Sequence, residues 1–225
     1  NAMDVLVTGA DSELGRTVAE TFRAAGHQVV VSGAARDELE LIAKELEVDA
    51  VVCDPADPIS LADVRTQFPR HLDTIVTIPG PTWGDGDPRA YSPAETAAAW
   101  RSAFDRTVVA AVLTVQAVSD NLRSGGSIVT VVGHGGADTA PGAAVKAALA
   151  EWTAGQSEQL GARGITINTV ACGRTSQPGY TGLAAVQSSV PAEIARLALF
   201  LATPAARHIT GQTLHVGGGA AASYG

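Results

Sequence analysis

The sequence predicts one doubly wound α/β domain, in which a parallel sheet of about seven strands carries helices on both faces. Short apolar runs alternate with helical stretches along the whole chain, the pattern of repeated strand–helix units with right-handed crossovers. The runs at 5–8 and 127–132 are almost continuously apolar or β-branched, as in strands that helices cover on both faces. The 225 residues suit a single domain, which we place at 3–225, with Asn1-Ala2 as a tag remnant.

The expected elements follow in chain order. Strands are expected at 5–8, 28–32, 50–53, 74–78, 127–132, 165–170 and 213–216. Helices are expected at 14–25, 37–46, 59–68, 94–122, 143–160 and 192–201. Gly26 ends the first helix, and Leu39, Ile42 and Leu46 share one apolar face of the second. The triplet Ser124-Gly125-Gly126 is expected to end the long helix 94–122. Ligands of such sheets bind beyond the carboxyl ends of the strands.

Charge and composition exclude several function classes. The net charge is −8 and no run of Lys or Arg occurs, which disfavours nucleic acid and an acidic membrane surface. Apolar stretches reach strand length only, and no secretory signal opens the chain. Cys53 and Cys172 are isolated, so neither a disulfide framework nor a metal site is suggested. We therefore expect a cytoplasmic protein with a small-molecule ligand.

The first strand runs directly into the turn Thr8-Gly9-Ala10-Asp11-Ser12-Glu13-Leu14-Gly15 at a helix start. A helix N-terminus offers free N–H groups and partial positive charge, so it attracts a pyrophosphate. Here, and in segments along the whole chain, the sequence resembles the short-chain dehydrogenase/reductase family, whose fingerprint is Thr-Gly, three residues, Gly, one residue, Gly. Gly9 and Gly15 match, whereas Glu13 replaces the middle glycine.

The resemblance implies a Rossmann-type fold that binds NAD or NADP. The implied cofactor-binding residues are Gly9, Ser12, Leu14, Gly15, Arg36, Asp54, Gly80, Lys146 and Gly173. Three departures lead us to expect weak or lost binding. Glu13 adds bulk where the backbone should approach phosphate, unless it points to solvent. Pro55, beside the adenine-contacting Asp54, has no backbone N–H. Thr77-Ile78-Pro79 replaces the family's Asn-Asn-Ala before Gly80.

The end of the second strand distinguishes NAD from NADP in dinucleotide-binding folds. An acidic residue there binds the ribose diol, and a basic residue accommodates a 2′-phosphate. The segment Ser32-Gly33-Ala34-Ala35 offers neither. Arg36 is close enough to reach a 2′-phosphate, although we favour the alternative that it is a solvated residue at a helix start.

The family's general acid–base chemistry around a hydride transfer uses Asn, Ser, Tyr and Lys. Lys146 matches the Lys, but the other positions fall on Thr107, Gly133 and Gly142. No small shift of the alignment restores the Ser–Tyr pair. The candidate replacements are His134, Asp138 and Tyr180, and His134 comes first because an imidazole exchanges protons near neutral pH. The simpler interpretation of each is an ordinary loop residue.

Two hypotheses follow for the function. The vacant positions favour a catalytically degenerate member that binds a dinucleotide weakly or serves as a binding or partner subunit. The retained Gly9, Asp54 and Lys146 favour the alternative, an active NAD(P)-dependent oxidoreductase that acts on a small carbonyl or alcohol with nonstandard residues. The substrate-covering segment between Gly173 and Pro191 has few apolar anchors, so a large hydrophobic substrate is not suggested.

Alanine is concentrated in two of the expected helices, around 97–111 and 143–154. In the family these two helices commonly form a four-helix contact between subunits, so the resemblance implies a homodimer or homotetramer. The alternative is that alanine only reflects helix propensity.

Overall fold

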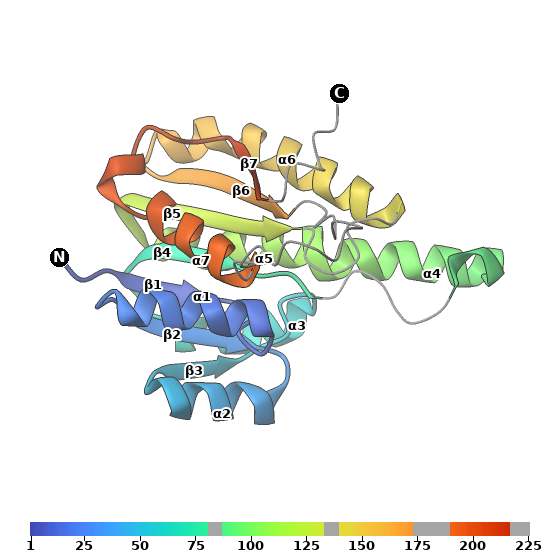
Figure 1. Cartoon of the computed structure of the whole chain (residues 1–225), viewed down its shortest axis with the longest axis horizontal. Helices are drawn as coiled ribbons and strands as arrows, with labels where there is room; N and C mark the ends of the chain where they lie inside the picture. The colour runs from blue at the N-terminus through green and yellow to red at the C-terminus, as the bar shows by residue number, and fades with distance from the viewer. Residues whose placement is uncertain (81–86, 133–139, 173–189, 217–225) are drawn as a thin grey trace, which may run out of the picture.

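The computed structural model describes residues 1–80, 87–132, 140–172 and 190–216. One sheet of seven parallel strands runs through the molecule in the order β3-β2-β1-β4-β5-β6-β7 (Figure 1). The strands are β1 (Asp4–Val7), β2 (Gln28–Gly33), β3 (Asp49–Val52), β4 (Leu72–Thr77), β5 (Leu122–Val132), β6 (Thr166–Cys172) and β7 (Thr213–Val216). The predicted doubly wound α/β fold is confirmed, and every predicted strand is present.

Helices cover both faces of this sheet (Figure 1). On one face lie α1 (Glu13–Ala24), α2 (Arg36–Leu46) and α7 (Val190–Leu201). On the other lie α3 (Pro58–Val64), α5 (Ala110–Val118) and α6 (Ala140–Gly161). Helix α4 (Pro93–Phe104) extends beyond the edge of the sheet, on the side of the carboxyl ends of the strands (Figure 1). Among the described helices, none is long and apolar enough to cross a membrane.

The core consists of two apolar layers, one on each side of the sheet, because strand side chains alternate between its faces. In β1, Val5 and Val7 face the α1 layer, while Leu6 faces the α3 and α5 layer. Among the described residues, Phe22 of α1 is the largest fully buried side chain, and it packs in the first layer. This packing supports the carboxyl end of β1, where the glycine-rich turn begins.

The single long helix predicted for residues 94–122 is wrong in two respects. A π-helical segment, Asp105–Val109, separates α4 from α5, and α5 ends at Val118. The chain from Leu122 onward belongs to β5, since Leu122 is buried and pairs with Leu72 of β4. The glycines expected to end a helix therefore lie within a strand. A Cβ at Gly126 would lie 2.9 Å from the carbonyl oxygen of Asp73, so the close approach of β4 requires glycine there.

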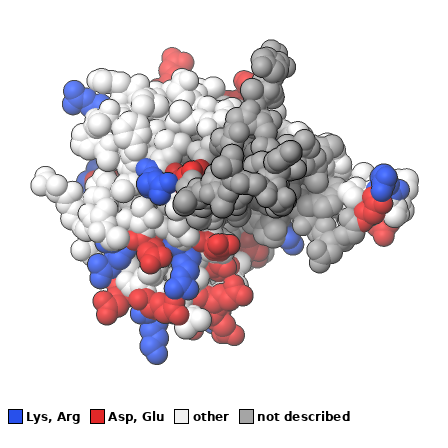
Figure 2. All heavy atoms as spheres, viewed as in Figure 1, with Lys and Arg blue, Asp and Glu red and all other residues white. Residues whose placement is uncertain are grey.

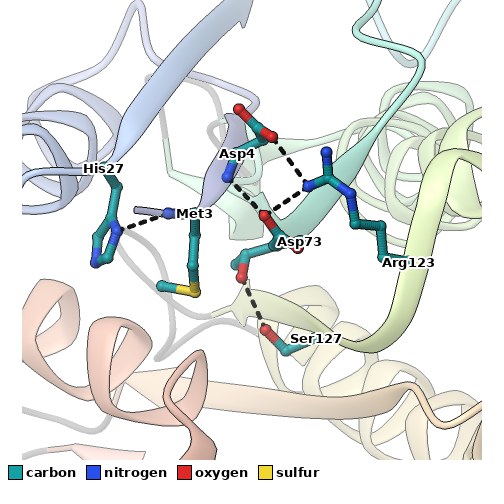
Figure 3. Close-up of polar contacts among 7 residues, drawn as sticks. Met3, Asp4, His27, Asp73, Arg123 and Ser127 are labelled. Atoms are coloured by element: carbon teal, nitrogen blue, oxygen red, sulfur yellow. Dashed lines mark hydrogen bonds and ion pairs between the residues drawn. The ribbon is translucent and has the colours of Figure 1, made fainter. Parts of the chain in front are cut away.

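Polar contacts hold β1, β4 and β5 in register at the amino end of the sheet, far from the carboxyl ends (Figure 3). Asp73 Oδ2 accepts hydrogen bonds from the Asp4 backbone N–H at 2.8 Å and from Arg123 Nη1 at 2.8 Å. Arg123 also pairs with the Asp4 carboxylate at 2.9 Å. Because these charges are partly exposed, solvent screens the ion pairs and they add little to the stability. Their main effect is on alignment.

Candidate functional site

A cleft of about 770 Å³ opens at the carboxyl ends of β1 to β4. The sheet order reverses between β1 and β4, which is the switch point where open α/β sheets bind ligands. One wall comes from the glycine-rich turn and from the ends of β2 and β3, and the other comes from α4 and the π-helical segment. Of the predicted cofactor-binding residues, Gly9, Ser12, Leu14, Asp54 and Gly80 line this cleft.

The glycine-rich turn requires its two retained glycines for different reasons. Gly9 has a φ of +64°, and a Cβ there would lie 2.4 Å from the carbonyl oxygen of Ile78 at the end of β4. Gly15 does not line the cleft but is buried behind the turn, where a Cβ would lie 2.0 Å from the carbonyl oxygen of Gly9. Ser12 caps α1 by accepting a hydrogen bond from the Gly15 N–H at 3.1 Å. The turn therefore presents backbone and the helix N-terminus to the cleft.

Glu13 does not obstruct this turn, contrary to one of the two expectations for it. It is the first residue of α1, it is exposed, and it does not line the cleft. Its backbone lies outside the left-handed region, so the fold has no need of glycine there. A carboxylate in the first turn of a helix is also favoured by the helix dipole.

The end of β2 contains a contact that the sequence analysis missed. Asp11, from the glycine-rich turn, accepts a hydrogen bond at Oδ2 from the Ala35 N–H at 2.9 Å. A Cβ at Gly33 would lie 2.6 Å from Asp11 Oδ1. The one available signal was an acidic residue within the glycine-rich turn. Arg36, by contrast, does not line the cleft, because it is exposed and pairs with Glu40 at 3.2 Å.

Asp54 follows β3 and lies at the cleft as predicted. Its Oδ1 accepts a hydrogen bond from the Ala56 N–H at 3.0 Å, and its own N–H donates to Ser60 Oγ at 3.1 Å. The side chain thus shapes the β3–α3 turn, and Pro55 also lines the cleft. An adenine contact by Asp54 stays a prediction.

The position that matches the family's Asn lies at an irregularity of the helix. Thr107 is buried in the π-helical segment, and its hydroxyl donates to the carbonyl oxygen of Ala103. Beside it is a small cavity of about 10 Å³, whose lining includes Thr77 and Thr130. The hydroxyls of these two threonines are buried without a hydrogen-bond partner among the described residues. This space suits a single water molecule and is polar, as a buried water site must be.

Lys146 lies on α6, half-buried, and donates a hydrogen bond from Nζ to the carbonyl oxygen of Cys172 at 2.7 Å. The lysine is therefore held at the carboxyl end of β6 and is not a relic on an exposed helix end. Burial raises the pKa of the Cys172 thiol to about 11, so this thiol stays neutral beside the ammonium group. Gly142, at the position of the family's Tyr, is buried in α6. His134 and Gly173 lie outside the described residues, as do Gly133, Asp138 and Tyr180.

Comparison with known proteins identifies the family. The family profile described as Enoyl-(Acyl carrier protein) reductase matches residues 9–221. The 3-oxoacyl-[acyl-carrier-protein] reductase FabG of Escherichia coli K12 is 30% identical over 237 residues, covering 95% of each chain. The chain belongs to the short-chain dehydrogenase/reductase family. The resemblance predicted from the glycine turn and the later segments is thereby confirmed at the level of the family.

Two further similarities cover almost the whole chain. A Mycobacterium tuberculosis H37Rv protein, whose name describes it only as a candidate oxidoreductase, is 63% identical over 227 residues and covers 99% of this chain and 100% of its own. The crystal structure of a dehydrogenase/reductase from Sinorhizobium meliloti 1021 superposes with a TM-score of 0.80 at 25% identity, covering 97% of this chain and 95% of the other. This short-chain dehydrogenase/reductase domain is therefore similar to oxidoreductases over its full described extent.

Proposed function

We propose that this family member is an active NAD(P)-dependent oxidoreductase that acts on a small carbonyl or alcohol. The observation that carries the proposal is the cleft of about 770 Å³ at the switch point of the sheet, bounded by the glycine-rich turn. Its volume falls within the roughly 300–1,000 Å³ of ordinary small-molecule sites. The relatives named as reductases or oxidoreductases support the active alternative better than the degenerate one.

The residues present fit a dinucleotide. Gly9 and the first turn of α1 offer bare backbone at the floor of the cleft, and the first N–H groups of a helix have no partner within it. These groups suit a pyrophosphate. The bound cofactor would supply or accept the hydride. Since Glu13 is exposed and outside the cleft, one of the three reasons to expect weak or lost binding no longer applies.

The proton chemistry rests on this chain's own residues. Lys146 holds its ammonium group at the carboxyl end of β6, beside β5. In this proposal Lys146 binds cofactor hydroxyls and His134, two positions beyond the end of β5, donates or accepts the proton. The arrangement is nonstandard for the family because Thr107, Gly133 and Gly142 occupy the positions of Asn, Ser and Tyr.

Calorimetric titration with NAD, NADP and their reduced forms tests the cofactor part of the proposal. Oxidation of reduced dinucleotide with a panel of small aldehydes and ketones tests the chemistry. We expect turnover that Lys146→Ala and His134→Ala each reduce at least tenfold, with exposed Lys44→Ala as the matched control. Binding without turnover on any carbonyl would favour the partner-subunit hypothesis, and absence of binding would refute the proposal.

A further inference from the structure

We propose that Asp11 selects NAD(H) against NADP(H), by supplying from the glycine-rich turn the carboxylate that is missing from the end of β2. This inference rests on the dinucleotide binding proposed above. The choice between the two cofactors is thereby assigned to the turn after β1. In dinucleotide-binding folds the acidic residue that makes this choice usually lies at the end of the second strand.

The geometry brings the Asp11 carboxylate to the end of β2. The residue is half-buried and lines the cleft together with Gly33 and Ala34, the last residue of β2 and the one after it. Its Oδ2 is held by the Ala35 N–H at 2.9 Å. Its Oδ1 makes no hydrogen bond to any residue in the described part of the chain, so it can accept one from a ligand hydroxyl.

The same contact explains why β2 ends without an acidic side chain. A Cβ at Gly33 would lie 2.6 Å from Asp11 Oδ1 and 2.7 Å from Asp11 Cγ. No side chain fits at Gly33 while Asp11 holds this position. A carboxylate therefore lies beside the last residue of β2, but it comes from the turn after β1. A carboxylate at this place accepts hydrogen bonds from a ribose diol.

The surrounding charges act in the same direction, against a 2′-phosphate. Arg36, the basic residue closest in sequence to the end of β2, is paired with Glu40 and does not line the cleft. Glu38 lies in the first turn of α2. Figure 2 shows acidic side chains interspersed with a smaller number of basic ones over the lower part of the molecule, where Figure 1 places α2. The 2′-phosphate of NADP(H), if placed beside Asp11, would be repelled by the carboxylate at short range.

The arginines of the cleft belong to its other wall. Arg101 lies on α4 and Arg106 in the π-helical segment. A Cβ at Gly80 would contact the Arg106 side chain at 3.5 Å, so the stem of this arginine lies just beyond the end of β4. Strand β1 separates β4 from β2, which corresponds to roughly 10 Å across the sheet. These cations therefore lie on the wall of the cleft opposite the end of β2.

The test is the ratio of two dissociation constants, which does not depend on catalytic activity. Calorimetric titration with NADH and NADPH, and with the fragments 5′-AMP and adenosine 2′,5′-bisphosphate, is carried out on the native protein and on Asp11→Asn. Asparagine keeps an oxygen that can accept from the Ala35 N–H, so the turn should persist. The matched control is Asp37→Asn, which removes an exposed carboxylate from α2 that does not line the cleft.

We expect native protein to bind NADH at least about tenfold more tightly than NADPH, since one hydrogen bond to a charged group and one like-charge contact are at stake. Asp11→Asn should reduce that ratio by about tenfold, and Asp37→Asn should leave it within about twofold. If both dinucleotides bind but NADPH binds equally or better, or if Asp11→Asn leaves the ratio unchanged, the inference is wrong while the proposed function stands. If neither dinucleotide binds, both are wrong.

Discussion

Lys146 Nζ donates a 2.7 Å hydrogen bond to the carbonyl oxygen of Cys172, which connects α6 to the last residue of β6. The bond fixes the ammonium group at the carboxyl end of the sheet, next to the end of β5. An ammonium group has three donors, so this bond still leaves capacity for cofactor hydroxyls. Lys146 therefore has a structural role that does not depend on catalysis.

The first prediction separates this structural role from the cofactor-binding role proposed for Lys146. Lys146→Met keeps the length of the side chain but removes the bond to Cys172, so it should lower the free energy of unfolding by about 1–2 kcal/mol. Lys44→Met, at an exposed position of α2, should change it by less than about 0.5 kcal/mol. Urea unfolding followed by circular dichroism measures both. Equal stabilities of the two variants would show that the Lys146 bond contributes nothing.

The second prediction compares two glycines that share a positive φ but differ in the space around them. Gly9 has a φ of +64° and no room for a Cβ, whereas Gly26 has a φ of +89° and nothing within 4 Å of that position. Gly26→Ala should cost only the backbone penalty of about 1–2 kcal/mol. Gly9→Ala should cost roughly 1–3 kcal/mol more, because the methyl group collides with Ile78.

Urea unfolding measures this difference, and dinucleotide titration of the two variants should show that binding is lost only in Gly9→Ala. Equal stability of the two variants would contradict the close approach of Gly9 to Ile78 at the end of β4.

The third prediction concerns pH and His27. Burial lowers the pKa of His27 below its usual 6.5, and the positively charged chain amino group lowers it further. The Met3 N–H donates to His27 Nδ1 at 3.1 Å, which requires the unprotonated nitrogen (Figure 3). Below pH 6.5 the His27 side chain is therefore protonated to a greater extent in the unfolded chain than in the folded protein. The contribution of His27 to stability is present above pH 6.5 and is lost as the pH falls through its lowered pKa.

The measurement is the free energy of unfolding of native protein and of His27→Gln between about pH 8 and about pH 5. The decrease toward acid should be smaller in His27→Gln than in native protein. His71→Gln, which changes an exposed histidine before β4, is the control and should retain the full decrease. A native-like slope in His27→Gln would contradict the prediction.

The fourth prediction is that the protein forms a homodimer or homotetramer through α4 and α6. Much of α4 is exposed, and α6 presents exposed alanines, including Ala143, Ala147 and Ala154. Helix faces of small residues allow the close approach that a four-helix contact needs. Light scattering of micromolar protein should give the mass of two or four chains, and a monomer mass would refute the prediction.

Ala148→Arg, at a partly exposed position of α6, should reduce that mass to one chain or, for a tetramer, to two. Ala24→Arg changes an exposed alanine at the end of α1, in the helix layer on the opposite face of the sheet, and should not change the mass. Persistence of the oligomer in Ala148→Arg would place the contact elsewhere.

The sequence by itself determined the fold class and the position of the glycine-rich turn. Apolar strand runs and amphipathic helices are local patterns, and burial on two faces follows from them without knowledge of distant contacts. Gly9 and Gly15 were identifiable because a strand, a tight turn and a helix start follow one another in the chain. The helix break at Thr107 was not identifiable, because the sequence around it has no proline or glycine to mark it.

The tertiary structure alone decided which side chains meet at the ends of the strands. Asp11 reaches Ala35 across 24 residues of sequence, and Lys146 reaches Cys172 across 26. Neither contact follows from spacing along the chain, because each depends on which strands are neighbours and on how far each one extends. For the same reason, Ser124-Gly125-Gly126 read as the end of a helix, although the pairing of Leu122 with Leu72 extends β5 through it. Local pattern determines the elements, whereas long-range packing determines the composition of the site.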